Sequence, residues 1–405
     1  MKKLVFFPSD PINAYIQKGR TYEYLEEYYN PGNYFDEVYC LSPWGEVEEE
    51  VIGKIHYIKA APFKFAKIIK KIKPDIIRGY GGYCCADWVS YSKVKGIPTV
   101  VSVHDTNPAT IYDSLKYADG IICMSQAVKD SVIKLVPDIT KNIWIMPNRI
   151  DINLFSKKTD INFFQHLNKR FPGKKHILHV GRKTRQKNLD TVIKAMKYLD
   201  DDIVSIFIGL GDIDEYKNLA TEEKVVDRCF FVDSVPNDEL PLWYSWCDCM
   251  CTPSRWEGFG FVFIEAAACE ACVVTSNIGP MNEYFTNGLN SILIDDYENP
   301  LILANAIQYA LRDSKEIQEI RKKARDVGLK FQKDIIDQQE ISIYETMFKI
   351  KPNNRINNSL KKKRFEAITR PVFLILKKIG LGKLYKWVKF IINRSMILPL
   401  AITVP

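Results

Sequence analysis

Short apolar segments alternate with amphipathic segments along most of the sequence, and this alternation is the feature that most constrains the fold. The run Thr99–His104 is apolar, whereas Lys64–Ile72 and Gln126–Val136 have the spacing of amphipathic helices. Alternation of this kind is typical of a parallel sheet that is covered by helices. The other strands predicted in the first half are Leu4–Pro8, Glu37–Leu41, Asp75–Arg78, Gly120–Met124 and Ile143–Met146.

A second alternating series follows a polar, irregular stretch from Asn148 to Lys175, which we expect to connect two domains. A chain of 405 residues is too long for one ordinary hydrophobic core and fits two. We therefore predict two Rossmann-like α/β domains in series, with a site at the carboxyl ends of the strands. The predicted strands are Ile177–Gly181, Ile203–Gly209, Cys229–Asp233 and Cys247–Thr252, and the predicted helices are Lys187–Leu199, Glu239–Ser245, Leu301–Arg312, Glu316–Phe331 and Ile335–Phe348.

The positive charge is concentrated at the C-terminus. Residues 351–405 carry thirteen Lys and Arg against one acid, Glu366, so that this segment has a net charge of +12. Because the whole chain has a net charge of +8, the first 350 residues have a net charge of −4. A basic tail beside an acidic body disfavours a nucleic-acid-binding function, which needs positive charge spread over a groove.

The tail has a helical periodicity in addition to its charge. Residues 359–394 contain apolar side chains on one helical face, with lysines away from that face and with Trp387 between them. Such a helix suits an anionic membrane surface. The alternative is a helix that packs on its own domain or on a second subunit, with its lysines in solvent.

Ten cysteines are scattered through the chain, and no metal site is expected from them. Five of them lie between Cys247 and Cys272, but they alternate along an apolar strand or flank a helix end, and no histidine lies near. Buried reduced thiols are expected there rather than a zinc site. No stretch reaches 18 apolar residues and Met1–Asp10 lacks the apolar core of a signal peptide, so that we expect a cytoplasmic protein.

The segment Pro253–Asp295 contains the residues that are most informative about function. Glu257 and Glu265 lie eight positions apart with Gly258-Phe259-Gly260 between them, at a predicted turn from strand to helix. Such a turn leaves backbone N–H groups free at a helix N-terminus, where an anion is stabilised. Two carboxylates beside those donors suit a ligand that is anionic in the middle and hydroxylated at both ends, as a nucleotide-sugar is.

Two cations and a histidine follow other predicted strands. Arg182 and Lys187 lie directly after the strand HILHVG, where they would hold a diphosphate or would be solvated charges at a helix start. His104 and Asp105 end the strand PTVVSVHD at the same edge. A histidine at a strand end is also often structural.

The Glu-x7-Glu pattern, framed by PSRWEGFG and by ACVVTSNIGPMNEYF, closely resembles the retaining glycosyltransferases of the GT-B fold, family 4. The resemblance covers about residues 1–350. It implies two Rossmann-like domains that face each other across a cleft, with boundaries near 1–165 and 166–335. It also implies a helix, 336–350, that returns to the N-terminal domain, and residues 351–405 remain as the basic tail.

The resemblance also assigns roles in transfer from a nucleoside-diphosphate-sugar with retention of configuration and without a metal or other cofactor. Glu257 would bind the sugar hydroxyls with the backbone of Phe259 and Gly260, and Glu265 would bind the ribose. Arg182 and Lys187 match the GR…KN motif that contacts the diphosphate, and His104 would lie near the reacting carbon. The base would lie near Val235.

Two departures from the family pattern affect the N-terminal domain and the linker. The family's Gly-Gly loop is Lys18-Gly19 here, so that a lysine would supply charge where backbone amides usually serve. The interdomain Asn-Gly is Asn148-Arg149. On the acceptor side, the candidates are Tyr80, Gly81, Gly82 and Asp105.

The predicted partners are a nucleotide-sugar donor, a glycan or lipid-linked acceptor and an anionic membrane surface, in the synthesis of a surface polysaccharide or a glycolipid. A non-catalytic scaffold subunit with the same fold is an alternative, as is a nucleotide-sugar epimerase. A scaffold is disfavoured because Glu257, Glu265, Arg182 and Lys187 are all present. Turnover of the donor without an acceptor would identify an epimerase.

Overall fold

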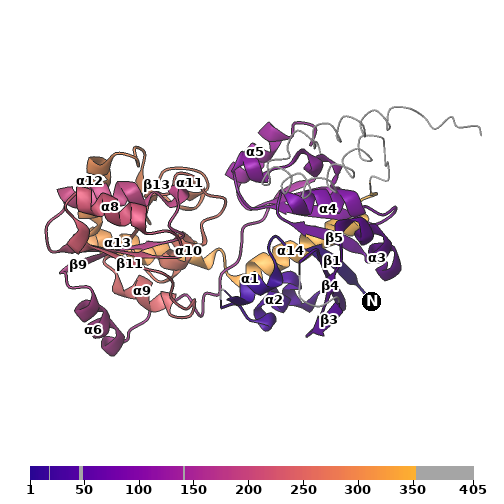
Figure 1. Ribbon diagram of the computed structural model, residues 1–405, viewed down its shortest axis with the longest axis horizontal. Coiled ribbons are helices and arrows are strands. Elements are labelled where there is room, and N and C mark those ends of the chain that lie inside the picture. Colours follow the sequence, from indigo (N-terminus) through magenta and orange to yellow (C-terminus); the bar gives the residue numbers. More distant parts are fainter. Residues whose placement is uncertain (18, 45–48, 140–141, 353–405) are drawn as a thin grey trace, which may run out of the picture.

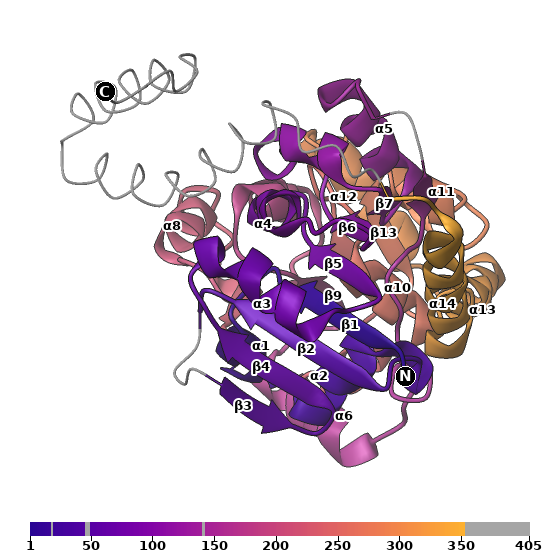
Figure 2. The same cartoon turned by 90° about the vertical axis from the view of Figure 1, so that its right-hand side faces the viewer.

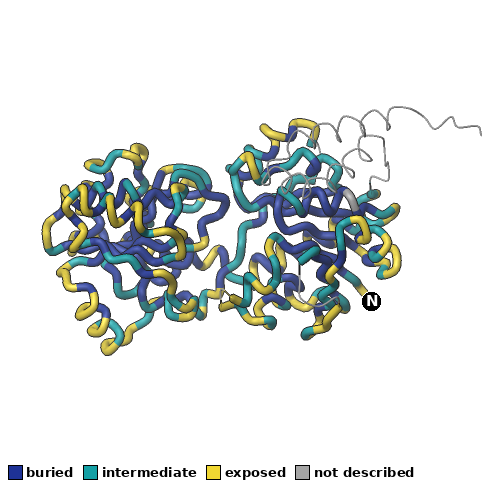
Figure 3. The backbone as a smooth tube through the Cα atoms, in the orientation of Figure 1, coloured by how far each residue is buried: buried dark blue, intermediate teal, exposed yellow. Residues whose placement is uncertain are grey.

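Strands that are buried along their whole length form the centre of each of two domains (Figure 1). In β10 (Ile203–Ile208) and β6 (Thr99–Val103) every residue is buried. Helices cover both faces of such strands, and Figure 3 shows buried backbone at the middle of both domains. The computed structural model describes residues 1–352 except 18, 45–48 and 140–141, so that the basic tail predicted at 351–405 lies almost wholly outside the described residues.

The N-terminal domain contains a sheet in which the described strands have the order β3-β4-β2-β1-β5-β6-β7-β8. Every neighbouring pair is parallel except β3 and β4, which are antiparallel. The other strands of this sheet are β1 (Lys3–Phe7), β2 (Glu37–Ser42), β3 (Glu49–Ile52), β4 (Ile55–Lys59), β5 (Ile76–Tyr80), β7 (Gly120–Cys123) and β8 (Ile143–Ile145). Its helices are α1 (Ile12–Gln17), α2 (Tyr22–Tyr29), α3 (Phe65–Ile72), α4 (Cys84–Ser92) and α5 (Gln126–Leu135).

The C-terminal domain has a second sheet, in which the described strands are all parallel and have the order β11-β10-β9-β12-β13-β14. The remaining strands are β9 (Lys175–Val180), β11 (Cys229–Val232), β12 (Cys249–Thr252), β13 (Val273–Ser276) and β14 (Ile292–Ile294). The helices are α6 (Ile161–Arg170), α7 (Leu189–Ala195), α8 (Asp214–Glu222), α9 (Leu240–Trp246), α10 (Phe261–Ala268), α11 (Met281–Tyr284), α12 (Pro300–Ala310) and α13 (Lys315–Leu329).

In both sheets the chain reverses its direction of strand order at one point. That point lies between β1 and β5 in the first sheet and between β9 and β12 in the second. The connections that leave these strands diverge to opposite faces of the sheet, so that a crevice opens at the carboxyl ends. The segments that follow β9 and β12 contain Arg182, Lys187 and Glu257, and they meet at the second of these points.

The stretch from Asn148 to Lys175 is not wholly irregular, and this part of the prediction was wrong. It contains α6, whose first turn is capped by Asp160, because the carboxylate accepts a hydrogen bond of 2.9 Å from the N–H of Phe163. The helix lies on the surface and only Leu167 is fully buried, so that its sequence is mostly polar.

The last helix, α14 (Lys333–Lys349), lies beside the first sheet (Figure 2), and a buried ionic network joins it and the linker to that sheet. Arg149 pairs with Asp337 and with Glu340 of α14, and Glu340 also pairs with Arg78 of β5. The backbone of Arg149 does not have a positive φ. The position at which the family has a glycine therefore needs no left-handed backbone in this chain. The departure at this position therefore serves to attach α14 to the N-terminal domain.

Candidate active site

The Gly-Phe-Gly turn connects β12 to α10, as the sequence predicts. Gly260 has φ of +82° and precedes Phe261, the first residue of α10. A Cβ at Gly260 would lie 2.7 Å from the side chains of Met281 and Phe263, so that only glycine fits without a shift. The turn directs the free N–H groups of α10 into the crevice, where they favour an anion.

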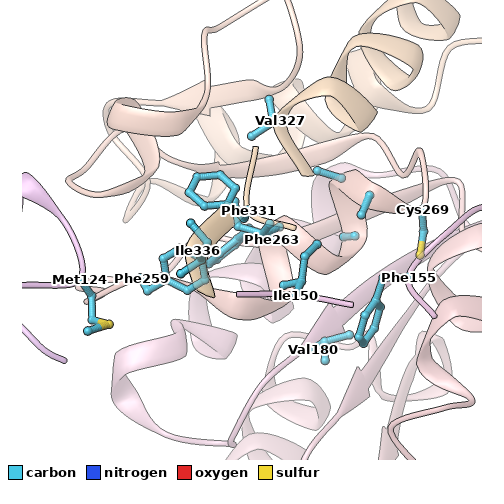
Figure 4. Close-up of a cluster of buried hydrophobic side chains, with 14 of the residues drawn as sticks. Met124, Ile150, Phe155, Val180, Phe259, Phe263, Cys269, Val327, Phe331 and Ile336 are labelled. Atoms are coloured by element: carbon cyan, nitrogen blue, oxygen red, sulfur yellow. The ribbon is translucent and has the colours of Figure 1, made fainter. Parts of the chain in front are cut away.

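Phe259 anchors this turn in the core. Its side chain is 3% exposed and packs against Tyr284 and Phe331, with ring centroids 5.6 and 5.4 Å away. Figure 4 shows Phe259 beside Phe331, Phe263 and Ile336 in a buried apolar cluster. The side chain of Phe259 therefore fixes the position of the loop and leaves its backbone to face a ligand.

Lys187 and Glu257 form a buried ion pair at the bottom of the crevice. The Lys187 Nζ lies 2.5 Å from Glu257 Oε1, and the two residues are 9% and 5% exposed. Asn188 holds the two segments together, because its side-chain amide donates to the carbonyl of Pro253 at 2.9 Å. The pair leaves the second carboxylate oxygen of Glu257 and the remaining protons of Lys187 for a ligand.

Arg182 is exposed at the rim of the same cavity, where it faces solvent. The adjacent Lys183, which the sequence did not single out, is 4% exposed and donates to the carbonyl groups of Gly209 and Val232. Burial lowers the pKa of Lys183. Lys183 thus joins the ends of β9, β10 and β11, whereas the exposed Arg182 is placed to contact a ligand.

The N-terminal domain approaches this turn very closely. A Cβ at Gly258 would lie 1.7 Å from the carbonyl oxygen of His104, and the Ser125 hydroxyl donates to the carbonyl of Gly258 at 2.8 Å. Glycine at position 258 is therefore required by contact between the domains. This contact places His104 and Asp105 opposite Glu257, as the positions of these residues at strand ends predict.

The imidazole of His104 contains a buried polar atom that lacks a partner. Nε2 is inaccessible to solvent and has no hydrogen bond in the described part of the chain. Burial, together with the positive charge of Arg78, lowers the pKa of His104 to about 4, so that the ring is neutral near pH 7. A neutral imidazole at this place can exchange hydrogen bonds with a hydroxylated ligand.

Asp105 lines the same cavity as Arg182, from the N-terminal domain. Burial raises the pKa of Asp105, and the charge of Glu257 raises it further, whereas Arg182 lowers it. Its carboxylate accepts a hydrogen bond of 3.1 Å from the N–H of Asn107. Asp105 is thus already engaged with its own loop.

Glu265 is buried in the second turn of α10. It is 5% exposed, and the hydroxyl of Tyr244 donates to its Oε2 at 3.3 Å. Burial raises the pKa of Glu265 to about 7, against the influence of Arg20 from the N-terminal domain and of the Tyr244 hydrogen bond. A nearly unpaired carboxylate in this position has the capacity to accept two hydrogen bonds from a diol.

Two adjoining cavities lie between the domains. The first includes His104, Asp105, Arg182, Lys187, Glu257 and Gly258-Phe259-Gly260 in its lining. The second, of about 430 Å³, is lined by side chains such as Tyr15, Arg20, Tyr24, Tyr80 and Asn237. His104, Asn148 and Phe261 line both cavities. The structure therefore brings most of the predicted site residues together.

Five of the predicted site residues that the structure describes do not line these two cavities, and one of them is Glu265, which is buried in α10. Val235 is half-buried against the core, and Gly19 is exposed with nothing near its Cβ position. Gly81 packs on the ring of Tyr83 and Gly82 on the carbonyl of Thr110. Lys18 lies outside the described residues. In the described part of the chain, the loops near Lys18 and Val235 contribute Arg20 and Asn237 to the second cavity.

The cysteines and other metal-ligating residues form no centre in the part of the chain that the structure describes. All ten cysteines are free thiols, and all except Cys84 are buried. No group of three or more His, Cys, Asp or Glu side chains is placed to hold a metal ion among the described residues. Within the same residues, no helix combines the length and the apolar character needed to span a membrane.

Comparison with known proteins places the chain in a family. Residues 160–327 match the family model of glycosyl transferases group 1, and residues 37–154 match that of glycosyltransferase family 4. The chain belongs to the group 1 glycosyltransferases. The predicted GT-B fold, with its two Rossmann-like domains, is confirmed by its similarity to solved glycosyltransferases.

Two curated relatives and one solved structure illustrate what this chain is similar to. An uncharacterized glycosyltransferase of Methanocaldococcus jannaschii is 29% identical over 73% of this chain and 82% of its own length. The O-antigen chain mannosyltransferase RfbU of Salmonella typhimurium is 27% identical over 48% of this chain and 57% of its own. HepE of Anabaena, solved in complex with UDP-glucose, has a TM-score of 0.68 at 18% identity, over 86% of this chain and all of its own.

Proposed function

We propose that this glycosyltransferase transfers a sugar from a nucleoside-diphosphate-sugar to a glycan or lipid-linked acceptor with retention of anomeric configuration. The observation that carries the proposal is the grouping of Lys187, Glu257 and Arg182 with the N-terminus of α10 at one topological switch point. A diphosphate would lie against Arg182, Lys187 and the N–H groups that follow Gly260.

The two carboxylates suit the two hydroxylated ends of such a donor. Glu257 is fixed by Lys187 and would accept hydrogen bonds from hydroxyls of the sugar. Glu265, deeper along α10, would accept both ribose hydroxyls. HepE of Anabaena, which has the same fold, was solved with UDP-glucose, and this supports a donor of that class.

The proposed chemistry depends on fixed positive charge. Arg182, Lys187 and the helix N-terminus would stabilise the diphosphate as it leaves, and such preorganised charge is usually a large part of catalysis. The acceptor hydroxyl would attack from the face that the diphosphate leaves, and a phosphate oxygen would take its proton. We propose that the reaction needs no metal, because these cations would supply the charge.

The setting is proposed from the relatives and from the sequence of the tail. RfbU of Salmonella typhimurium is an O-antigen chain mannosyltransferase, and synthesis of a surface polysaccharide or glycolipid is proposed by analogy. Residues 359–394 would bind an anionic membrane surface on its cytoplasmic side, which would bring the enzyme to a lipid-linked acceptor. Flotation of the full chain with anionic and with neutral vesicles would test this.

The first experiment is thermal stabilisation by UDP-, GDP-, ADP- and dTDP-sugars. A ligand that binds only the native state raises the melting temperature, and a tighter ligand raises it more at the same concentration. We expect one nucleotide class to stabilise the wild type but not Arg182→Ala or Glu265→Ala, and EDTA to leave turnover unchanged. If no nucleotide-sugar stabilises the wild type, the scaffold function is favoured. Turnover of the donor to an isomer without an acceptor would instead identify an epimerase.

A further inference from the structure

A third cavity lies on the N-terminal domain, away from the predicted donor residues. It has a volume of about 430 Å³ and lies over the carboxyl ends of β2 and β4. Its lining combines aromatic side chains with polar groups, namely Asn13, Tyr22, Ser42, Trp44, Tyr57 and Lys59. A concave surface of aromatic rings with a few polar groups is typical of a ligand site.

The aromatic residues of this cavity are held in place by their neighbours. Trp44 packs edge-on against Trp88, with ring centroids 5.1 Å apart, and Tyr57 packs against Tyr22 at 6.0 Å. The backbone N–H of Trp44 donates to the hydroxyl of Ser42 at 3.1 Å. Fixed rings bind the apolar faces of a sugar without further loss of side-chain freedom.

One residue that lines this cavity, Tyr57, has a buried polar atom without a partner. The hydroxyl of Tyr57 is inaccessible to solvent and makes no hydrogen bond within the described residues. A buried hydroxyl without a partner is costly unless a ligand or water satisfies it. The combination of apolar rings and an unsatisfied hydroxyl matches a saccharide, which has both apolar faces and hydroxyl groups.

Two helices, α1 and α2, lie beside both the third cavity and the acceptor side of the cleft. From α1, Asn13 lines the third cavity and Tyr15 lines the tyrosine-rich cavity between the domains. From α2, Tyr22 lines the third cavity and Tyr24 lines the cavity between the domains. The strand order β4-β2-β1-β5-β6 gives the distance between Lys59, which ends β4 beside the third cavity, and His104, which follows β6. Four strand spacings separate these two residues, which is roughly 19 Å and longer than one sugar unit.

We infer that the third cavity is a remote subsite for an oligosaccharide acceptor. The inference rests on the proposed transferase function and deepens it: the enzyme extends an existing glycan of several sugars. The end of the glycan that receives the new sugar lies near His104, and an earlier sugar stacks on Trp44 and Tyr57. A monosaccharide acceptor would leave this subsite empty.

Binding to an array of mono- to hexasaccharides, including neutral, amino and uronic sugars, tests the inference on the full chain. We expect the wild type to bind oligosaccharides and to bind the corresponding monosaccharides about tenfold more weakly or worse. Trp44→Ala should lose this preference for length. Trp44 also packs on Trp88, so that Trp44→Ala could disturb the fold. Asn13→Trp is therefore a second variant, which fills the cavity from its exposed rim and leaves Trp44 in place. Tyr198→Ala, which removes an exposed ring from the C-terminal domain, is the matched control.

The outcomes separate this inference from the proposed function. Stabilisation by UDP-glucose or another donor should be the same in the wild type, Trp44→Ala and Asn13→Trp. If the donor binds but the array shows no preference for longer glycans, or if both cavity variants keep that preference, the remote subsite is excluded and the transferase function stands. Absence of glycan binding by the wild type also excludes the subsite. If no donor binds, the proposed function itself fails.

Discussion

Glu283 of the C-terminal domain caps helix α5 of the N-terminal domain. Its two carboxylate oxygens accept hydrogen bonds from the backbone N–H groups of Gln126 at 2.7 Å and of Ala127 at 2.8 Å. The Ser125 hydroxyl accepts from Val128 within the same turn and donates to Gly258 across the cleft. Two N–H groups in the first turn of α5 are therefore satisfied by the opposite domain, so that closure of the cleft completes the capping of α5.

Loss of this interdomain cap should weaken donor binding. We expect Glu283→Ala to lose about 1 kcal/mol of capping energy in the closed form only, and to bind UDP-glucose, or the donor identified by thermal stabilisation, about fivefold more weakly. Titration calorimetry measures this affinity, and small-angle scattering should show a larger radius of gyration. Ser314→Ala removes a cap within the C-terminal domain, where Ser314 accepts from Ile317, and should leave donor affinity unchanged. Equal effects of the two variants would contradict the coupling.

A methyl group at position 258 should prevent closure without unfolding either domain. The Cβ of Gly258→Ala would lie 1.7 Å from the His104 carbonyl oxygen, which belongs to the other domain. We expect turnover to fall about 100-fold, because a displacement near 1 Å at a reacting centre has effects of that size, whereas the melting temperature should change little. Gly288→Ala, at an open turn with φ of +71°, should show the reverse: a loss of stability with normal turnover.

The part of the site that could be predicted from sequence is the part that each segment forms locally. Gly258-Phe259-Gly260 lies at a strand-to-helix turn whose strand and helix have clear periodicities, so that the positions of Glu257 and Glu265 followed from the order of residues. Arg182 and Lys187 follow β9 for the same reason.

The contacts between domains could not be predicted, because they depend on the packing of distant segments. Nothing in the local sequence of Glu283 indicates that it caps a helix that begins some 150 residues earlier. Lys183 resembles its basic neighbours in the sequence, yet it alone binds the carbonyl groups of two adjacent strands. The hairpin of β3 and β4 was missed because acidic residues of Glu49–Ile52 obscure the strand pattern at an exposed sheet edge.

The raised pKa of Glu265 predicts a pH dependence of donor binding. Burial raises the pKa to about 7, so that the carboxylate is largely ionised at pH 8 and largely protonated at pH 6. If the ribose binds the ionised form, the affinity for UDP-glucose should fall as the pH drops, by up to about tenfold per unit below 7. The diphosphate of UDP-glucose is esterified at both ends and does not titrate in this range. Calorimetry from pH 6 to 8 measures the slope, and Glu265→Gln should bind weakly at every pH; a flat wild-type profile would exclude Glu265 as the titrating group.

The network around Glu340 predicts a large loss of stability from a single neutralisation. Glu340 is fully buried, and although burial opposes ionisation, Arg78 and Arg149 lower its pKa and keep it charged. Glu340→Gln would leave these two buried guanidinium groups without that compensating charge, at a cost of about 3–5 kcal/mol. We expect a clear decrease in the thermal unfolding midpoint. Glu319→Gln removes an exposed pair with Lys322 at 3.1 Å and should cost less than about 1 kcal/mol. Similar midpoints for the two variants would show that α14 is held by its apolar face, with residues such as Ile343 and Met347, rather than by charge.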